Sequence, residues 1–231
     1  MWYDEKKNAA WEECFVNYRA VLFDFDLTLI DASPAILACY KHTLTKMGCV
    51  PPDDEVIRRT IGLTVEDSLE QMSGCHDKAR IAKYREVYRV KADEVMVPGT
   101  SLLPYTRGTI RRLRAAGCKL GIVTSKNHAR TLLSLDKFQL KDAFDVIVGF
   151  EDIDRPKPDP QGLNRAVDLL GLSKDVVLYV GDSYVDARTA QAAGVDFAGV
   201  LTGTTTREEM ETYPHRLVAE HLGEVTDWLG V

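Results

Sequence analysis

Short apolar runs alternate with longer amphipathic stretches through most of the chain, and this pattern predicts its elements. The apolar run that begins at Ala20 predicts a buried strand ending at Asp24, and later runs predict strands at 119–123, 144–148, 176–180 and 197–200. Helical periodicity fills the intervals, with helices ending at Ala116 and near 127–135, 161–170 and 185–193. Strands that alternate with helices in this way are typical of a parallel α/β sheet that is covered by helices on both faces.

Residues 33–97 break this alternation, because they show helical patterns and no buried strand. Ser33 is the expected N-cap of the first helix, with Pro34 at its first helical position. Helices are predicted from there to about Met47, near 65–72 and near 77–95, followed by the closing turn Val97-Pro98-Gly99-Thr100. We therefore expect two parts: a core formed by residues 1–32 and 98–231, and a helical insertion at 33–97.

Composition excludes several classes of partner. The 231-residue chain has a formal net charge of −6, whereas nucleic-acid-binding surfaces normally carry a basic stripe. Its five cysteines include no Cys-x-x-Cys pair, so the sequence indicates neither a zinc site nor a disulfide framework. No apolar run approaches the roughly 18 residues of a membrane span, and the charged first residues are not typical of a signal peptide. We expect a soluble, cytoplasmic protein with no nucleic-acid or membrane partner.

A helix is also predicted ahead of the first strand. Trp11, Phe15 and Tyr18 recur there at helical spacing, with polar residues between them. We interpret this helix mainly as packing, although its aromatic face is also a surface for self-association. Both a monomer and a homodimer therefore stay open.

Two carboxylates, Asp24 and Asp26, follow the first strand at the edge where parallel sheets form their sites. A carboxylate at such a position can bind a hard cation through oxygen or attack phosphorus as a nucleophile. Thr28 is placed to hydrogen-bond and orient Asp26. Acidic residues also form turns at strand ends, so this pair alone leaves a structural role open.

Later strands also end in groups suited to phosphate. Thr124 and Ser125 precede a helix and offer hydroxyl donors, and Lys157 lies in a loop stiffened by flanking prolines. Asp182 and Asp186 follow the strand near 176–180, where two acids suit a magnesium site. Each group has a structural reading by itself, as a helix cap or a surface turn. Because parallel strands end at one edge, we expect these groups to converge on a phosphoryl site.

The motifs, taken in order, resemble those of the haloacid dehalogenase-like hydrolase superfamily: Asp-x-Asp-x-Thr, then Thr or Ser, then Lys, then Gly-Asp-x-x-x-Asp. The resemblance covers nearly the whole chain after the first twenty residues and implies a Rossmann-like, doubly wound core. The insertion is similar to the helical cap of the phosphoglycolate phosphatase-like branch, notably at residues 61–69. Leu27 is one departure, because many members have glycine at that position.

The resemblance implies a role for each matching residue. Asp24 would be the nucleophile that becomes an aspartyl-phosphate, and Asp26 would be the general acid and base. Lys157 would balance charge, and Thr124 would hold the phosphoryl oxygens as a further catalytic residue. The substrate-binding set would comprise Thr28, Thr124, Ser125 and Lys157. Mg²⁺ would be held by Asp24, Asp182, Asp186 and the backbone carbonyl of Asp26.

The leading hypothesis is a magnesium-dependent phosphatase acting on a small phosphorylated metabolite, such as phosphoglycolate or a sugar phosphate. A β-phosphoglucomutase-like sugar phosphomutase uses the same four motifs and remains an alternative, as do a pyrophosphatase and a nucleotidase. A phospho-acceptor signalling module would lack Asp26 and the cap, and a non-catalytic interaction protein would not require these acids. Within the insertion, the candidates to bind a carboxylate or a second phosphate are Arg58, Arg59, Lys83, Arg85 and Arg89, although most such residues on helices are solvated.

Overall fold

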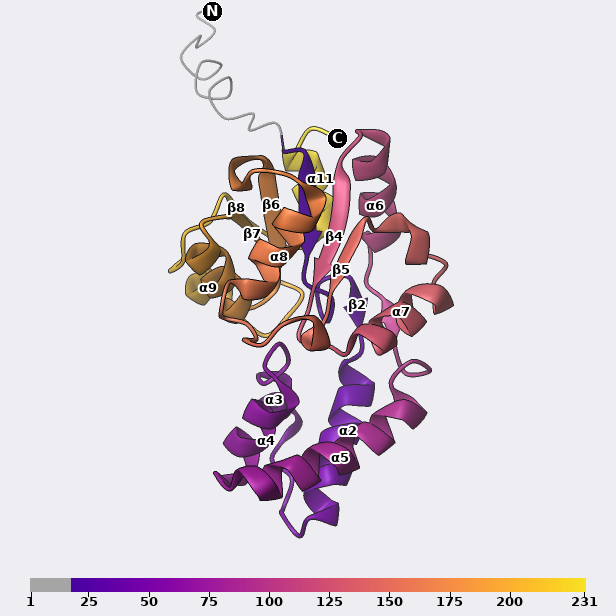
Figure 1. Cartoon of the computed structure of the whole chain (residues 1–231), viewed down its shortest axis with the longest axis vertical. Coiled ribbons are helices and arrows are strands. Elements are labelled where there is room, and N and C mark those ends of the chain that lie inside the picture. The colour runs from indigo at the N-terminus through magenta and orange to yellow at the C-terminus, as the bar shows by residue number, and fades with distance from the viewer. Residues whose placement is uncertain (1–17) are drawn as a thin grey trace, which may run out of the picture.

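The computed structural model describes residues 18–231 (Figure 1). The predicted helix with Trp11 and Phe15 lies outside the described residues, apart from Tyr18. That tyrosine is 7% exposed, and its hydroxyl donates a hydrogen bond to Asp196 Oδ2 at 2.8 Å. Its ring also contacts that of Trp228, with centroids 6.2 Å apart. Tyr18 therefore packs against the body of the protein.

Six parallel strands form the central sheet in the order β5-β4-β1-β6-β7-β8. They are β1 (Ala20–Phe23), β4 (Lys119–Val123), β5 (Val146–Val148), β6 (Val177–Gly181), β7 (Asp196–Val200) and β8 (Leu217–Ala219). Leu22 of β1 pairs with Gly121 on one side and with Tyr179 on the other. The predicted parallel α/β sheet is confirmed, with the Asp24-bearing strand at its centre.

Helices cover both faces of this sheet (Figure 1). They are α6 (Thr106–Ala115), α7 (His128–Lys137), α8 (Gln161–Leu170), α9 (Tyr184–Ala193), α10 (Arg207–Met210) and α11 (Leu222–Trp228), with short 3₁₀ turns η1 (Lys141–Ala143), η2 (Phe150–Asp152) and η3 (Lys174–Val176). Val21 and Phe23 belong to one buried hydrophobic cluster, and Ala20 and Leu22 belong to the other. Successive residues of a strand point to opposite faces, so β1 is apolar throughout because both of its faces are buried.

The helical insertion lies beyond the carboxyl ends of the strands, in the lower part of Figure 1. It contains α2 (Ser33–Lys46), α3 (Asp54–Arg58), α4 (Val65–Ser73) and α5 (Lys78–Val95). The chain leaves and re-enters the core through β2 (Ile30–Asp31) and β3 (Ser101–Leu102), which pair antiparallel. This two-stranded link holds the two connections side by side.

The start of α2 differs from the sequence prediction. Ser33 is the first helical residue, and Ala32 occupies the cap position without a side-chain hydrogen bond. Asp31 supplies the acceptor instead, because its Oδ1 takes the N–H of Ser33 at 2.8 Å. The Ser33 hydroxyl is then free to accept from Arg58 Nη1 of α3 at 2.9 Å.

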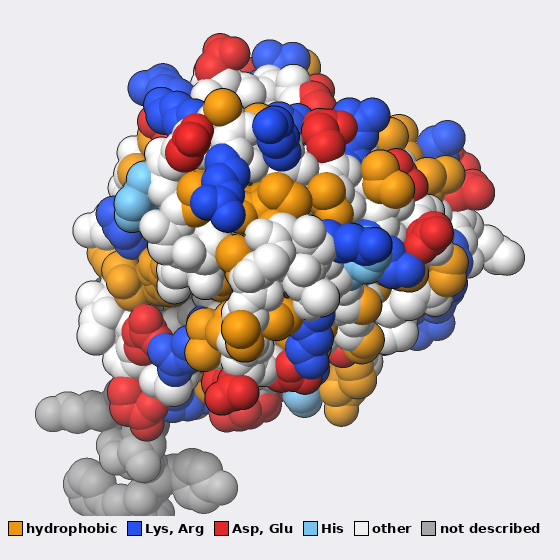
Figure 2. Space-filling model, turned by 90° about the horizontal axis from the view of Figure 1, so that it is seen from below, with side chains coloured by type: hydrophobic (Ala, Val, Ile, Leu, Met, Phe, Trp, Pro, Cys, Tyr) orange, Lys and Arg blue, Asp and Glu red, His pale blue; other side chains and the backbone are white. Residues whose placement is uncertain are grey.

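The surface of the insertion is mixed in charge. Figure 2 views the molecule from this end and shows basic and acidic side chains interspersed around hydrophobic groups near the middle of the face. Among the helices of residues 18–231, none combines the length and the apolar character needed to cross a membrane.

Candidate active site

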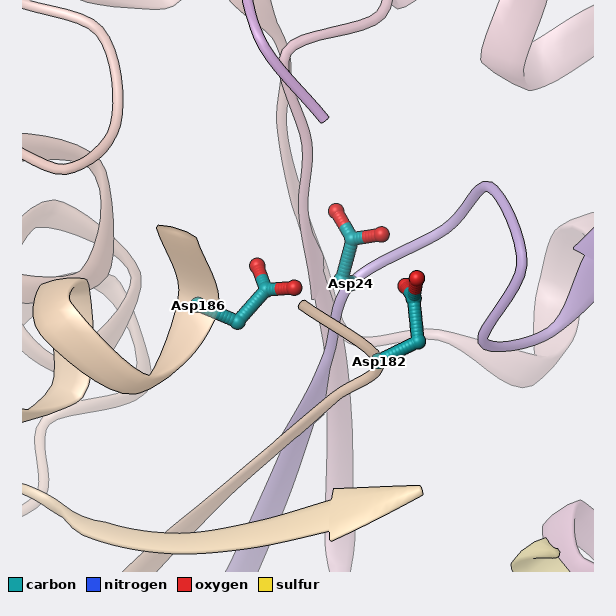
Figure 3. A group of neighbouring side chains, drawn as sticks. All are labelled: Asp24, Asp182 and Asp186. Atoms are coloured by element: carbon teal, nitrogen blue, oxygen red, sulfur yellow. The ribbon is translucent and has the colours of Figure 1, made fainter. Parts of the chain in front are cut away.

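Three buried carboxylates converge at the carboxyl edge of the sheet, as Figure 3 shows. Asp24 follows the central strand β1, Asp182 follows the neighbouring strand β6, and Asp186 lies in the first turn of α9. Each side chain offers an oxygen within 4.8 Å of the others, and each residue is at most 4% exposed. The parallel topology thus brings Asp24 next to two residues that lie 158 and 162 positions later in the sequence.

Lys157 places a single ammonium group inside this cluster. Its Nζ lies 2.5 Å from Asp24 Oδ1 and 2.7 Å from Asp186 Oδ1, and the residue is 4% exposed. Burial lowers the pKa of Lys157, but the attraction of Asp186 and Asp24 outweighs this and holds the pKa well above its usual value. Lys157 therefore stays charged and is a fixed partner of Asp24.

Asp186 is fully engaged in hydrogen bonds. Its Oδ1 accepts from Lys157 and, at 2.9 Å, from the hydroxyl of Tyr179. Its Oδ2 accepts from the hydroxyl of Ser183 at 2.6 Å and from the backbone N–H of Ser183 at 3.2 Å. A side chain at Gly181 would collide with Asp186, so glycine is what allows this close approach. Asp186 is therefore built to hold Lys157 in place.

Asp182 has one engaged oxygen and one that faces the backbone of a neighbouring loop. Thr28 is fully buried, and its hydroxyl donates to Asp182 Oδ1 at 3.0 Å. The sequence prediction that Thr28 orients Asp26 is thus replaced by an interaction with Asp182, because the loop after β1 turns Thr28 toward β6. A side chain at Gly203 would collide with Asp182 Oδ2.

The cluster fits a divalent cation. Three carboxylates oppose one ammonium group, and oxygen donors of this kind are what Mg²⁺ prefers. Burial raises the pKa of Asp24 to about 7 despite the attraction of Lys157, and burial together with Asp186 raises the pKa of Asp182 well above its usual range. Without a cation, these groups therefore tend to retain protons.

Asp26 lies apart from the cluster and is paired with Lys126. Both of its carboxylate oxygens lie 2.8 Å from Lys126 Nζ, and the two side chains are 14% and 7% exposed. Between Asp24 and Thr28, Leu27 adopts a left-handed conformation with φ of 61°, which glycine adopts most readily. This conformation agrees with the glycine expected at this position from the family that the motifs resemble. The hydroxyl of Thr202 donates to the Leu27 carbonyl at 2.5 Å and supports this turn.

Thr124 and Ser125 follow β4 on the wall of the same cavity as Asp24 and Asp26. The Thr124 hydroxyl accepts the backbone N–H of Lys126 at 3.1 Å. The Ser125 hydroxyl instead donates to the carbonyl of Gly62 in the insertion, at 2.9 Å. Ser125 therefore links the core to the insertion.

A cavity of about 470 Å³ separates the insertion from the carboxyl edge of the sheet. Of the five basic candidates in the insertion, Arg85 and Arg89 line it. Arg58 instead donates to Ser33, and Arg59 pairs with Glu55 at 3.8 Å.

Two functional contacts escaped the sequence analysis. In the sequence, Lys126 is only the residue that follows Thr124 and Ser125, and its spacing does not predict an ion pair with Asp26. Tyr179 lies within an apolar strand, so its position in the sequence predicts only a core residue. In the structure, its hydroxyl lies 3.3 Å from Lys157 Nζ and donates to Asp186 Oδ1. Only the side-by-side pairing of β5, β4, β1 and β6 brings these groups together.

Comparison with known proteins agrees with this geometry. Residues 21–200 match the family described as haloacid dehalogenase-like hydrolase. A solved haloacid dehalogenase-like hydrolase from Bacteroides fragilis is 41% identical with a TM-score of 0.89, and the match covers 90% of this chain and 99% of that one. The chain belongs to the haloacid dehalogenase-like hydrolase family.

Curated relatives indicate which kind of hydrolase the chain is. A phosphoglycolate phosphatase from Cereibacter sphaeroides is 35% identical over 90% of this chain and 96% of its own length. A pyrophosphatase from Bacillus cereus is 29% identical over 90% of this chain and 94% of its own length. The chain is accordingly an enzyme of the phosphatase class.

Proposed function

We propose that the chain is a Mg²⁺-dependent phosphatase that hydrolyses a small phosphomonoester through an aspartyl-phosphate on Asp24. One observation carries the proposal: Asp24 is buried at the end of the central strand, borders the cavity, and has Lys157 Nζ 2.5 Å from one oxygen. A carboxylate fixed in this way can present its other oxygen to phosphorus. Lys157 offsets the negative charge that accumulates there.

In the first half-reaction, an oxygen of Asp24 attacks phosphorus and the P–O bond to the leaving group breaks. Asp26, which carries the proton taken from water in the preceding turnover, donates it to the departing oxygen, so that the alcohol leaves in its neutral form. Thr124 serves as the hydroxyl donor to the phosphoryl oxygens, with Ser125 beside it on the cavity wall.

In the second half-reaction, water attacks the phosphorus of the aspartyl-phosphate. Asp26, now a carboxylate, accepts a proton from that water, and Asp24 departs as a free carboxylate with release of inorganic phosphate. Lys126 contacts both oxygens of Asp26 at 2.8 Å and fixes the orientation of this carboxylate.

The metal site would be formed by Asp24, Asp182 and the backbone carbonyl of Asp26, with Asp186 in the same buried group. Bound Mg²⁺ would offset the charge between the phosphoryl group and Asp24. Thr28 holds one oxygen of Asp182, and Asp186 acts through Lys157 because its own oxygens are already engaged.

The helical insertion at 33–97 would act as a cap over the core formed by 1–32 and 98–231. Ile36, Tyr40 and Tyr88 line the cavity from the insertion, opposite Asp24. An apolar roof of this kind excludes water from the reacting groups and strengthens the electrostatic interactions inside.

The decisive experiment is phosphate release by the wild type and by Asp24→Asn, with Asp136→Asn as a control on the exposed face of α7. The panel contains 2-phosphoglycolate, sugar phosphates, nucleoside monophosphates and inorganic pyrophosphate, the last because a pyrophosphatase is among the relatives. We expect Asp24→Asn to lose at least about 10³-fold in kcat/KM and chelation of Mg²⁺ to stop turnover, while Asp136→Asn stays within about twofold. Turnover that survives in Asp24→Asn would contradict the mechanism.

A further inference from the structure

Helix α5 presents two guanidinium groups to the cavity, on the side contributed by the insertion. Arg85 and Arg89 are four residues apart, so they lie one above the other on the same face of the helix. Both line the cavity that also contains Asp24 and Thr124. The insertion therefore brings two cationic groups to the cavity, beside the acidic Glu66 and Asp93, at a place that the proposed chemistry on phosphorus does not use.

Arg85 is held in position by two neighbours. Its Nη1 lies 3.2 Å from Glu66 Oε1 of α4, and its guanidinium carbon lies 6.0 Å from the ring centroid of Phe150 in the core. Glu66 orients one edge of the group, and the aromatic face supports its plane. Within residues 18–231, Nε and Nη2 of Arg85 have no hydrogen-bond partner, so one edge of the fork is available to a ligand.

Two of the other three basic groups of the cavity are already committed, and the third, Arg89, is an exposed side chain whose Nη1 lies 3.9 Å from Glu86 Oε2, without an aromatic support among the described residues. Lys126 is bound by both oxygens of Asp26. Arg130 donates to Asp93 Oδ1 at 2.7 and 3.1 Å and to the carbonyl of Arg89 at 3.1 Å. Among the four basic residues lining the cavity, Arg85 is the one that is both oriented and open.

We propose that Arg85 is a specificity-determining residue that binds a second oxyanionic group, a carboxylate or a second phosphoryl group, on the phosphomonoester. The proposal rests on the proposed phosphatase function. A guanidinium fork matches the two oxygens of such a group in a way that an ammonium cannot.

The test compares Arg85→Gln with Lys83→Gln, which removes the same charge from the same helix. Both residues are exposed, but only Arg85 lines the cavity. The substrates are 2-phosphoglycolate, a sugar bisphosphate and ethyl phosphate, whose tails are a carboxylate, a second phosphate and an uncharged group. We expect Arg85→Gln to lower kcat/KM at least about tenfold for the doubly anionic substrate that the wild type prefers, and less than about threefold for ethyl phosphate. Arg85→Lys should restore part of the loss, and Lys83→Gln should change neither.

The first two substrates decide whether the group is a carboxylate or a phosphate. Equal losses on all substrates would mean that Arg85 supports only the fold, and a wild type without preference for a second anion would overturn the proposal. If the wild type releases no phosphate from any substrate, the proposed function fails separately. Calorimetric titration with 2-phosphoglycolate and the bisphosphate then tests Arg85 alone: binding weakened by Arg85→Gln supports the proposal, and unchanged or absent binding contradicts it.

Discussion

Four hydrogen bonds reach the carboxylate of Asp186, whereas Asp182 accepts one from Thr28. The two acids of the Gly-Asp-x-x-x-Asp motif therefore have different work to do, although the sequence makes them look equivalent. An oxygen that already accepts two donors is a poor ligand for a cation. In the proposed metal site, Asp182 would be the direct partner of Asp24, and Asp186 would support Lys157.

This difference predicts that the same Asp→Asn substitution will mainly affect Mg²⁺ binding at Asp182 and mainly affect stability at Asp186. Asp182→Asn should raise the apparent Kd for Mg²⁺ at least about tenfold, because it removes a charged ligand. Asp186→Asn should change that Kd less, but should lower the free energy of unfolding by about 3 kcal/mol, because Lys157 loses a buried partner. Calorimetric titration with Mg²⁺ and urea unfolding measure the two effects, and a reversed order would contradict the assignment.

Metal binding should also depend on pH in a defined direction. Burial raises the pKa of Asp24 to about 7, so below that pH the group is protonated in the metal-free protein, and Mg²⁺ has to displace the proton. The apparent Kd for Mg²⁺ should therefore rise as pH falls below about 7, and it should level off at higher pH. Because the pKa of Asp182 is raised as well, the rise should be about tenfold per pH unit or more. Titrations in two buffers of different ionisation enthalpy will show the proton release, and an affinity independent of pH between 5 and 8 would refute it.

Among the elements, α7 connects the active-site edge to the link between core and insertion. Its last residue, Lys137, donates from Nζ to three carbonyls of the closing turn, those of Val97, Pro98 and Thr100, at 3.0, 3.0 and 2.7 Å. A single ammonium group thereby holds the turn that returns the chain to the sheet. The turn itself was predicted from Pro98-Gly99, but its partner 37 to 40 residues later was not.

Lys137→Met should loosen this turn without touching the catalytic groups. We expect the free energy of unfolding to fall by about 1 kcal/mol, since the lost hydrogen bonds are partly exposed to water. Lys141→Met removes the same charge from an exposed site in η1 and serves as the control, with an expected change within about 0.5 kcal/mol. Equal stability of the two variants in urea would show that the contact with the turn contributes nothing.

The sequence predicts an element well when local interactions stabilise it, and poorly when tertiary contacts do. β4 and α8 match their predicted ranges because apolar periodicity decides them locally. β8 has three residues, β2 and β3 have two each, and α3 has five, so none is long enough to show a period. These elements exist because tertiary pairing holds them.

The same reasoning applies to the site. The convergence of Asp24, Lys157 and Asp182 could be predicted because parallel strands end at one edge. Side-chain partners could not be predicted, because they depend on rotations within that edge: Thr28 meets Asp182, and Asp26 meets Lys126.

At the scale of the whole molecule, contacts across the cavity connect the insertion to the core. Ser125 donates to the Gly62 carbonyl at 2.9 Å, and Arg130 of α7 binds Asp93 of α5. Both contacts border the cavity, and each joins a residue of the insertion to a residue of the core. The strength of these contacts should therefore influence how readily the cavity closes over a substrate.

Asp93→Asn tests this idea because it weakens the Arg130 contact while leaving the catalytic groups in place. Asp93 is 63% exposed at its side chain, so the pair contributes at most about 1 kcal/mol, and we expect kcat/KM for the best substrate to fall by about two- to fivefold. Glu94→Gln is the matched control, because Glu94 is the next residue and pairs only with Lys91 within the part of the chain that the structure describes. High salt should reduce the difference between wild type and Asp93→Asn, since screening weakens the exposed pair in the wild type. If Asp93→Asn and Glu94→Gln have the same kcat/KM, the Arg130 contact does not govern closure.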